Sequence, residues 1–172
     1  KAAKPKVKEL DPSKTYVAEI KTNCGDFEIT LDAKRAPKTT ASFKSLADQR
    51  FYDNTTFHRI VTGFVIQGGD PTGVGTGGPG YSVREKPPKD LKYDIGVVAM
   101  AKTGAEPAGT SGSQFFVVTG PQAAELPPDY ALLGKVTGGM ETVDKIGAIV
   151  TDPRTDRPDD PVVIKSIRVS VR

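Results

Sequence analysis

Short apolar runs, separated by loops rich in glycine and proline, constrain the fold of this chain more than any other feature. Seven or eight runs have strand character, and none is long enough to cross a bilayer. The 14 prolines cluster in the loops, because proline has no N–H group to donate to a neighbouring strand. The expected strands are residues 16–22, 27–31, 56–62, 64–67, 95–101, 113–119, 131–136 and 162–171.

Two segments have the apolar spacing of a helix instead. The first begins near Pro37 and runs to about Gln49, with Phe43 and Leu46 on one face. The second is residues 140–149. Seven or eight strands with two short helices predict a mainly β protein, in which an antiparallel barrel is capped by the helices.

The chain divides into a basic stretch, residues 1–13, and one domain of ordinary size, residues 14–172. The first is expected to be a flexible arm or linker. The net charge of +3 is too small to predict nucleic-acid binding. A polar arm that begins without methionine favours an extracytoplasmic protein released from a leader, with the cytoplasm as the alternative. Nothing indicates obligate assembly, so a monomer is expected.

The chain lacks the residues that metal catalysis, a serine nucleophile or a phosphate-binding loop would need. His58 is the only histidine and has no cysteine cluster beside it, so we expect a structural histidine and no metal site. Ser111 and Ser113 flank a glycine, but G-x-S-x-G is absent and no base adjoins them. The glycine-rich residues 71–80 lack the Lys-Ser/Thr pair of a phosphate-binding loop. They are expected to form a tight loop that lets the backbone approach a ligand.

Arg59 is the strongest candidate for a functional residue. An arginine in an otherwise apolar strand is either paired in a salt bridge or exposed in a cleft, and both alternatives stay open. Gln114 and Phe116 are two residues apart on a strand and therefore face the same side, as do Val65 and Gln67. A surface with a guanidinium, two amides and aromatic carbon suits binding of an apolar group beside peptide carbonyls. It does not suit covalent catalysis.

Four motifs carry a resemblance to a known family: FHRIVTGFVIQGGDPTGVGTGGPG, GVVAMA, SGSQFFVVT and LLGKV. In order and spacing they resemble the cyclophilin peptidyl-prolyl isomerases, over about residues 16–171. The resemblance implies an eight-stranded antiparallel closed barrel capped by two short α-helices. It also implies cis–trans isomerisation of X-Pro bonds without cofactor or metal. The expected partners are proline-containing peptides and unfolded protein clients, whose folding the enzyme would assist.

The resemblance also assigns the site. Arg59 matches the catalytic arginine, and the proline pocket corresponds to Phe64, Val65, Phe116 and Leu126. The implied substrate-binding residues are Phe64, Val65, Gln67, Gly75, Ala101, Lys102, Gln114, Phe116, Leu126 and Tyr130.

This chain departs from the family pattern along the groove wall. Lys102 replaces a groove asparagine and is expected to act mainly through its backbone. Glu125 and Tyr130 replace a tryptophan and a histidine, and the chain has no tryptophan at all. We therefore expect weak binding of cyclosporin. The altered wall leaves an alternative function open, a proline-peptide binding module or chaperone whose catalysis is incidental.

Overall fold

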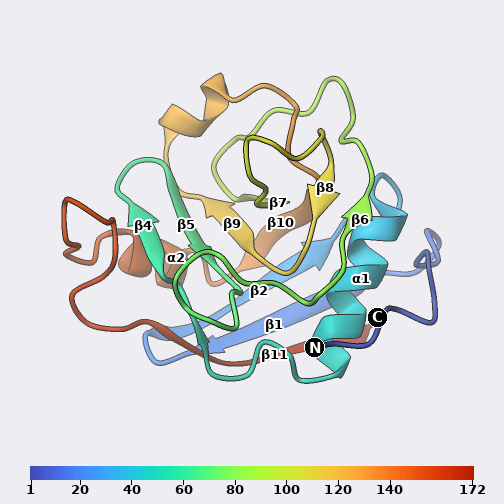
Figure 1. Ribbon diagram of the computed structural model, residues 1–172, viewed down its shortest axis with the longest axis horizontal. Helices are drawn as coiled ribbons and strands as arrows, with labels where there is room; N and C mark the ends of the chain where they lie inside the picture. Colours follow the sequence, from blue (N-terminus) through green and yellow to red (C-terminus); the bar gives the residue numbers. More distant parts are fainter.

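A computed structural model describes residues 1–172 as a mainly β fold with antiparallel strand pairing in every ladder (Figure 1). The strands are β1 (Tyr16–Thr22), β2 (Gly25–Leu31), β3 (Thr55–Thr56), β4 (Arg59–Val61), β5 (Val65–Gly68), β6 (Val83–Arg84), β7 (Val97–Met100), β8 (Thr110–Ser111), β9 (Phe115–Val118), β10 (Leu132–Gly138) and β11 (Val163–Val171). The helices are α1 (Pro37–Asp48), α2 (Met140–Gly147) and the 3-10 helix η1 (Pro121–Glu125).

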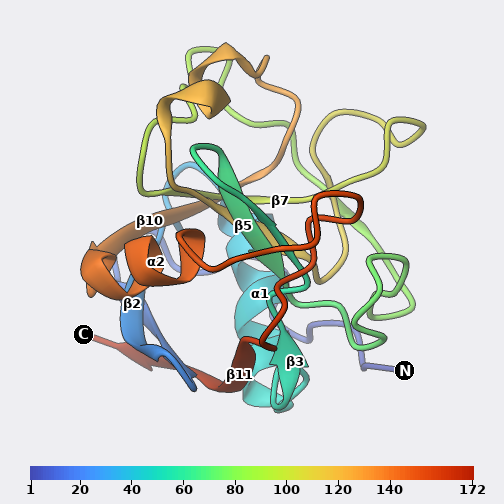
Figure 2. The same ribbon diagram turned by 90° about the vertical axis from the view of Figure 1, so that its left-hand side faces the viewer.

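Nine of the strands form one strongly curled, half-barrel sheet in the order β3-β11-β1-β2-β10-β7-β9-β5-β4. A separate ribbon pairs β6 with β8. Figure 1 shows α1 and α2 on opposite sides of the sheet, and Figure 2 shows α2 beside β2 and β10. The edge strands β3 and β4 share no ladder with each other. An isolated bridge between Thr56 and Asp70 links the end of β3 to the chain just beyond β5.

The predicted mainly β class, the antiparallel pairing and the two short helices are confirmed. The main sheet has nine strands instead of eight, because the single strand expected over residues 56–62 is divided into β3 and β4. The strands β6 and β8, like β3, contain two residues each. Helix α2 ends at Gly147 and not at residue 149, and the 3-10 helix η1 lies between two of the expected strands, where no helix was predicted.

Alternation along the central strands gives the sheet two buried faces. Ile66 on β5 points to the inner core, while its neighbours Val65 and Gln67 point to the other side. The inner face of β4, β5, β7 and β9 contributes Ile60, Ile66, Val98, Met100, Phe115 and Val117 to the larger core. The outer face contributes Val65, Ala99, Phe116 and Val118 to a smaller cluster. The smaller cluster is the floor on which the candidate site is built.

Helix α1 fixes one end of the curled sheet. Pro37 lies in its first turn, where the missing N–H costs no hydrogen bond. Phe43 and Leu46 are fully buried, and the ring of Phe43 meets Phe115 edge-on at 5.8 Å between centroids. The predicted apolar stripe therefore packs against the inner core. None of the helices is long and apolar enough to cross a membrane.

The N-terminal stretch lies against the domain. Leu10 is buried in the inner core, and its N–H donates to the carbonyl of Pro37. Ala3 exchanges two hydrogen bonds of 2.9 Å with the side chain of Gln49. Ala2 donates to the carbonyl of Pro79 in the glycine-rich loop. A structural division into an arm of residues 1–13 and a domain of residues 14–172 remains a prediction.

Candidate active site

Strand register places the polar and aromatic site residues in one row. Arg59 on β4 is the antiparallel partner of Gln67 on β5, and Gln67 is the partner of Phe116 on β9. Directly paired residues of antiparallel strands project from the same face. A guanidinium, an amide and an aromatic ring therefore lie side by side across three strands. The row continues to Ala99 on β7, the partner of Phe116.

A chain of hydrogen bonds holds the amides of this row. The Nη1–H of Arg59 donates to Oε1 of Gln67 at 3.3 Å, and Nε2 of Gln67 donates to Oε1 of Gln114 at 3.1 Å. Nε2 of Gln114 donates to the carbonyls of Gly75 and Gly77 at 3.0 and 2.9 Å. Arg59 makes no ion pair with any carboxylate. Its charge is therefore uncompensated, and four of its five N–H donors have no protein partner.

An apolar pocket of about 290 Å³ lies beside Arg59. The rings of Phe116 and Tyr130 meet edge-on in its wall, with centroids 5.5 Å apart. Burial raises the pKa of Tyr93 to about 12, so its hydroxyl stays protonated and donates to the carbonyl of Tyr130 at 2.7 Å. The nine lining residues are Arg59, Phe64, Val65, Gln67, Ala101, Lys102, Phe116, Leu126 and Tyr130. Their size and character suit one apolar ring with a cation at its edge.

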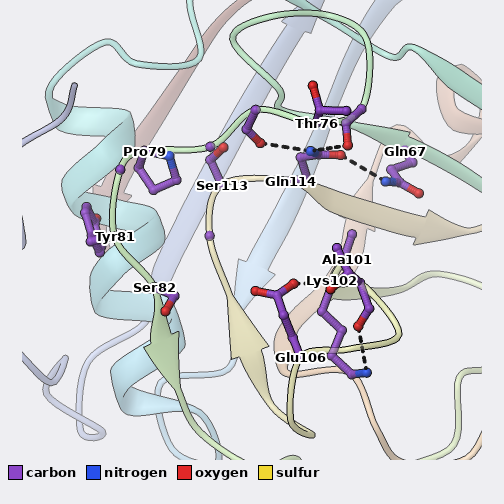
Figure 3. Close-up of a pocket in the computed structure, with 16 residues that line it drawn as sticks. Gln67, Thr76, Pro79, Tyr81, Ser82, Ala101, Lys102, Glu106, Ser113 and Gln114 are labelled. Carbon is purple, nitrogen blue, oxygen red and sulfur yellow. Dashed lines mark hydrogen bonds between the residues drawn. The ribbon is translucent and has the colours of Figure 1, made fainter.

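A second, more polar pocket of about 520 Å³ adjoins the first (Figure 3). Gln67, Ala101 and Lys102 line both pockets, so the two form one continuous groove. Gly75 and Gln114 belong to the second pocket. The structure thus brings all eleven residues expected from the resemblance to one groove. The individual roles of these residues remain predictions.

The glycine-rich loop that walls the second pocket is organised around Asp70. This carboxylate is fully buried and accepts hydrogen bonds from the hydroxyl and N–H of Thr72 and from the N–H of Gly75. Burial alone would raise the pKa of Asp70, but hydrogen bonds from Thr72, Gly77 and Gly75 outweigh it and hold the pKa below its usual value. Sequence reasoning missed Asp70, although Asp-Pro-Thr-Gly is a recognisable turn signal.

His58 is buried beneath the same loop. No hydrogen bond reaches its Nδ1, so the structural histidine expected from the sequence lacks a polar anchor at that atom. Burial lowers the pKa of His58, although the nearby Asp70 carboxylate acts in the opposite direction. Ser111 and Ser113 donate to backbone carbonyls and have no base beside them. No group of three or more His, Cys, Asp or Glu side chains could hold a metal ion.

The lowered pKa of His58 makes stability depend on pH. The unfolded chain binds a proton at a higher pH than the folded chain does, so acid favours unfolding. This contribution is complete above the unfolded pKa of about 6.5 and is lost as the pH falls toward the lower folded pKa. Urea denaturation at pH 7 and pH 5.5 should show a lower free energy of unfolding at pH 5.5. The difference should shrink in His58→Phe, and an undiminished difference in that variant would contradict the assignment.

Comparison with known proteins identifies the family to which this chain belongs. The family model described as cyclophilin type peptidyl-prolyl cis-trans isomerase/CLD matches residues 17–169. A peptidyl-prolyl cis-trans isomerase B of Streptomyces anulatus is 43% identical, over 90% of this chain and 97% of the relative. A peptidyl-prolyl cis-trans isomerase A of Mycobacterium tuberculosis is 40% identical, over 92% and 94%.

Solved structures agree with the sequence relatives. The crystal structure of a Cryptosporidium parvum cyclophilin type peptidyl-prolyl cis-trans isomerase superposes with a TM-score of 0.84 at 36% identity, covering 91% of this chain and 98% of that one. A crystal structure of that protein in the presence of the dipeptide Ala-Pro gives a TM-score of 0.82. Fold and sequence define an isomerase of X-Pro peptide bonds. The chain belongs to the cyclophilin-type peptidyl-prolyl cis-trans isomerases.

Proposed function

We propose that the groove accelerates X-Pro rotation by stabilising the twisted peptide bond through Arg59. Resonance between nitrogen and carbonyl sets a barrier of roughly 18–20 kcal/mol, and spontaneous exchange takes tens of seconds or more. At mid-rotation the imide nitrogen regains its lone pair and can accept a hydrogen bond. A donor that bonds to nitrogen only in that state lowers the barrier without equally stabilising the planar substrate.

The free charge of Arg59 is the observation that carries this mechanism. A guanidinium stays protonated at any relevant pH and offers several N–H groups in a rigid fork. One of these groups donates to Gln67, which restrains the side chain, and the other donors have no protein partner at the edge of the pocket. Gln67 therefore acts as the residue that orients Arg59. No covalent bond is made or broken, so neither a nucleophile nor a metal is needed.

The apolar pocket holds the proline ring against this donor. Phe64, Phe116 and Leu126 replace water on that side of the ring, and the lower local dielectric strengthens the hydrogen bond from Arg59. Val65 and Tyr130 complete the wall. Ala101, Gly75 and Gln114 line the rest of the groove, where the backbone of the peptide would lie.

The substrates we propose are X-Pro bonds in unfolded or exposed protein segments, so that the enzyme assists protein folding. Both pockets open to the surface, and an extended segment can therefore reach them. A protease-coupled assay with an Ala-Pro test peptide measures turnover directly. A refolding protein with a slow proline-limited phase tests the assistance. Binding of the peptide without turnover would instead support a binding module or chaperone.

We expect cyclosporin to bind weakly. Glu125, which stands where sensitive relatives have tryptophan, is exposed at the end of η1 and is not part of the pocket wall. A carboxylate in place of an indole removes apolar contact area and a hydrogen-bond donor. Titration with cyclosporin should give a dissociation constant above the sub-micromolar range, and Glu125→Trp should tighten it. A sub-micromolar value for the unaltered chain would refute the expectation.

A further inference from the structure

The side chain of Lys102 is the feature of the groove that the proposed mechanism does not use. The residue was expected to act mainly through its backbone, yet its side chain is only 4% exposed. A lysine is almost never buried to this extent unless its charge is paired. The ammonium nitrogen lies 2.6 Å from Oδ2 of Asp129 and 3.3 Å from the carbonyl of Thr103.

The same ammonium lies over an aromatic ring of the proline pocket. Its nitrogen is 5.4 Å from the ring centroid of Tyr130, within the range of a cation–π contact. Lys102 leaves the end of β7, while Asp129 and Tyr130 follow η1. Lys102 thus ties two separate loops together at the point where the two pockets meet.

The contacts of Tyr130 divide between its backbone and its ring. The backbone is fixed by Tyr93, whose hydroxyl donates to the carbonyl of Tyr130 and accepts from its N–H at 3.0 Å. The ring packs edge-on against the rings of Phe116 and Tyr93, with centroids 5.5 and 6.0 Å away, and the Lys102 ammonium lies over it. The N–H of Gly109 donates to the carbonyl of Asp129 and joins the loop of Lys102 to the same turn. Removing the ammonium would leave the ring with its two aromatic contacts alone and so loosen its position, while the backbone stays in place.

We propose that Lys102 is a positioning residue for the proline pocket. Through Asp129 and the ring of Tyr130, its buried ammonium keeps the pocket wall shaped around the proline ring. This inference rests on the proposed function of the groove and assigns a new role within it. The wall contacts planar and twisted substrate alike, so its loss weakens binding of both states. KM therefore rises while kcat changes little, in contrast to the loss of Arg59.

Lys102→Met keeps the apolar stem and removes the charge. We expect KM for an Ala-Pro tetrapeptide, and the dissociation constant from calorimetry, to rise about fivefold to tenfold, with kcat within about twofold. Lys102→Arg, which can still pair and stack, should give a value between those of the wild type and Lys102→Met. Lys44→Met is the matched control, because Lys44 also pairs at 2.6 Å, with Asp48 on α1, away from the groove. It should leave both constants unchanged.

A double-mutant cycle with Asp129→Asn separates positioning from general stabilisation. If Lys102 acts through Asp129, the double variant binds the peptide no more weakly than the worse single variant. Additive losses, or unchanged peptide affinity in a folded Lys102→Met, overturn the proposal. So does an equal fall in kcat and kcat/KM. The dissociation constant does not depend on turnover, so absence of isomerisation in the wild type would count against the proposed function alone.

Discussion

Replacing Arg59 with alanine is expected to slow X-Pro isomerisation by about a hundredfold or more, which corresponds to about 3 kcal/mol of transition-state stabilisation. The loss should appear in kcat and kcat/KM alike, because the hydrogen bond to the imide nitrogen forms at mid-rotation. The fold should survive. Arg59 is only partly buried and forms no ion pair, so its removal leaves no orphaned carboxylate. The protease-coupled assay measures the isomerisation rate, and a thermal melt shows whether the variant is folded.

Two further variants sharpen this result. Arg59→Lys keeps the charge but loses the rigid fork that Gln67 orients, so most of the hundredfold loss should remain. Arg154→Ala removes an arginine whose side chain is 87% exposed, and it should isomerise normally. Near-normal exchange by a folded Arg59→Ala would remove Arg59 from the mechanism, whatever the behaviour of the groove as a binding site.

The period of two along β5 and β9 was sufficient to predict which residues of one strand share a face, and Ile66 faces the core while Val65 and Gln67 face the other side. That Gln67 and Phe116 belong to one groove with Arg59 was implied only by the family resemblance, because spacing within a strand does not say which strands lie side by side. The place of Phe64 could not be derived in the same way. It lies outside β5, after Gly63, whose positive φ of 76° turns the chain between β4 and β5. Only the turned backbone decides that Phe64 joins the pocket.

Other features depend on contacts between segments far apart in the sequence. The side chain of Lys102 is buried because Asp129, 27 positions later, meets it across the two loops. An expectation for Lys102 drawn from the sequence alone could not include Asp129 as its partner. The strands β6 and β8 exist only because residues 83–84 and 110–111 pair with each other. The buried end of the N-terminal stretch likewise depends on a site for Leu10 that forms when the sheet and α1 pack.

The carboxylate of Asp70 is expected to be the second most sensitive point of the chain. Asp70→Asn keeps the shape but replaces a charged acceptor of several hydrogen bonds by a neutral amide with one acceptor oxygen. A hydrogen bond to a charged group contributes about 1.5–3 kcal/mol, so we expect the free energy of unfolding to fall by about 3 kcal/mol. Because Gly75 and the rest of the loop wall the second pocket, peptide affinity should fall as well.

A second turn of similar sequence, which begins at Asp11, supplies the control for Asp70→Asn. Asp11-Pro12-Ser13 resembles Asp70-Pro71-Thr72, and Asp11 also accepts from the N–H two residues later, at 2.9 Å against 2.8 Å for Asp70. Asp11 is exposed, so water can replace the lost hydrogen bonds. Asp11→Asn should therefore change stability little. Equal losses in the two variants would mean that the local turn, and not burial, gives Asp70 its importance.

The lowered pKa of Asp70 adds a pH signature with a definite sign. The folded chain holds this carboxylate ionised to a lower pH than the unfolded chain does, so its contribution is present above the unfolded pKa of about 3.9. The contribution is lost as the pH falls from there through the folded pKa. Urea denaturation between pH 7 and pH 3 should show a smaller decrease in the free energy of unfolding in Asp70→Asn than in the wild type.

Hydrogen exchange at the amides of Gly75 and Gly77 should accelerate in that variant, because both donate to the carboxylate of Asp70. Parallel acid profiles with unchanged exchange would show that the loop keeps its shape without Asp70.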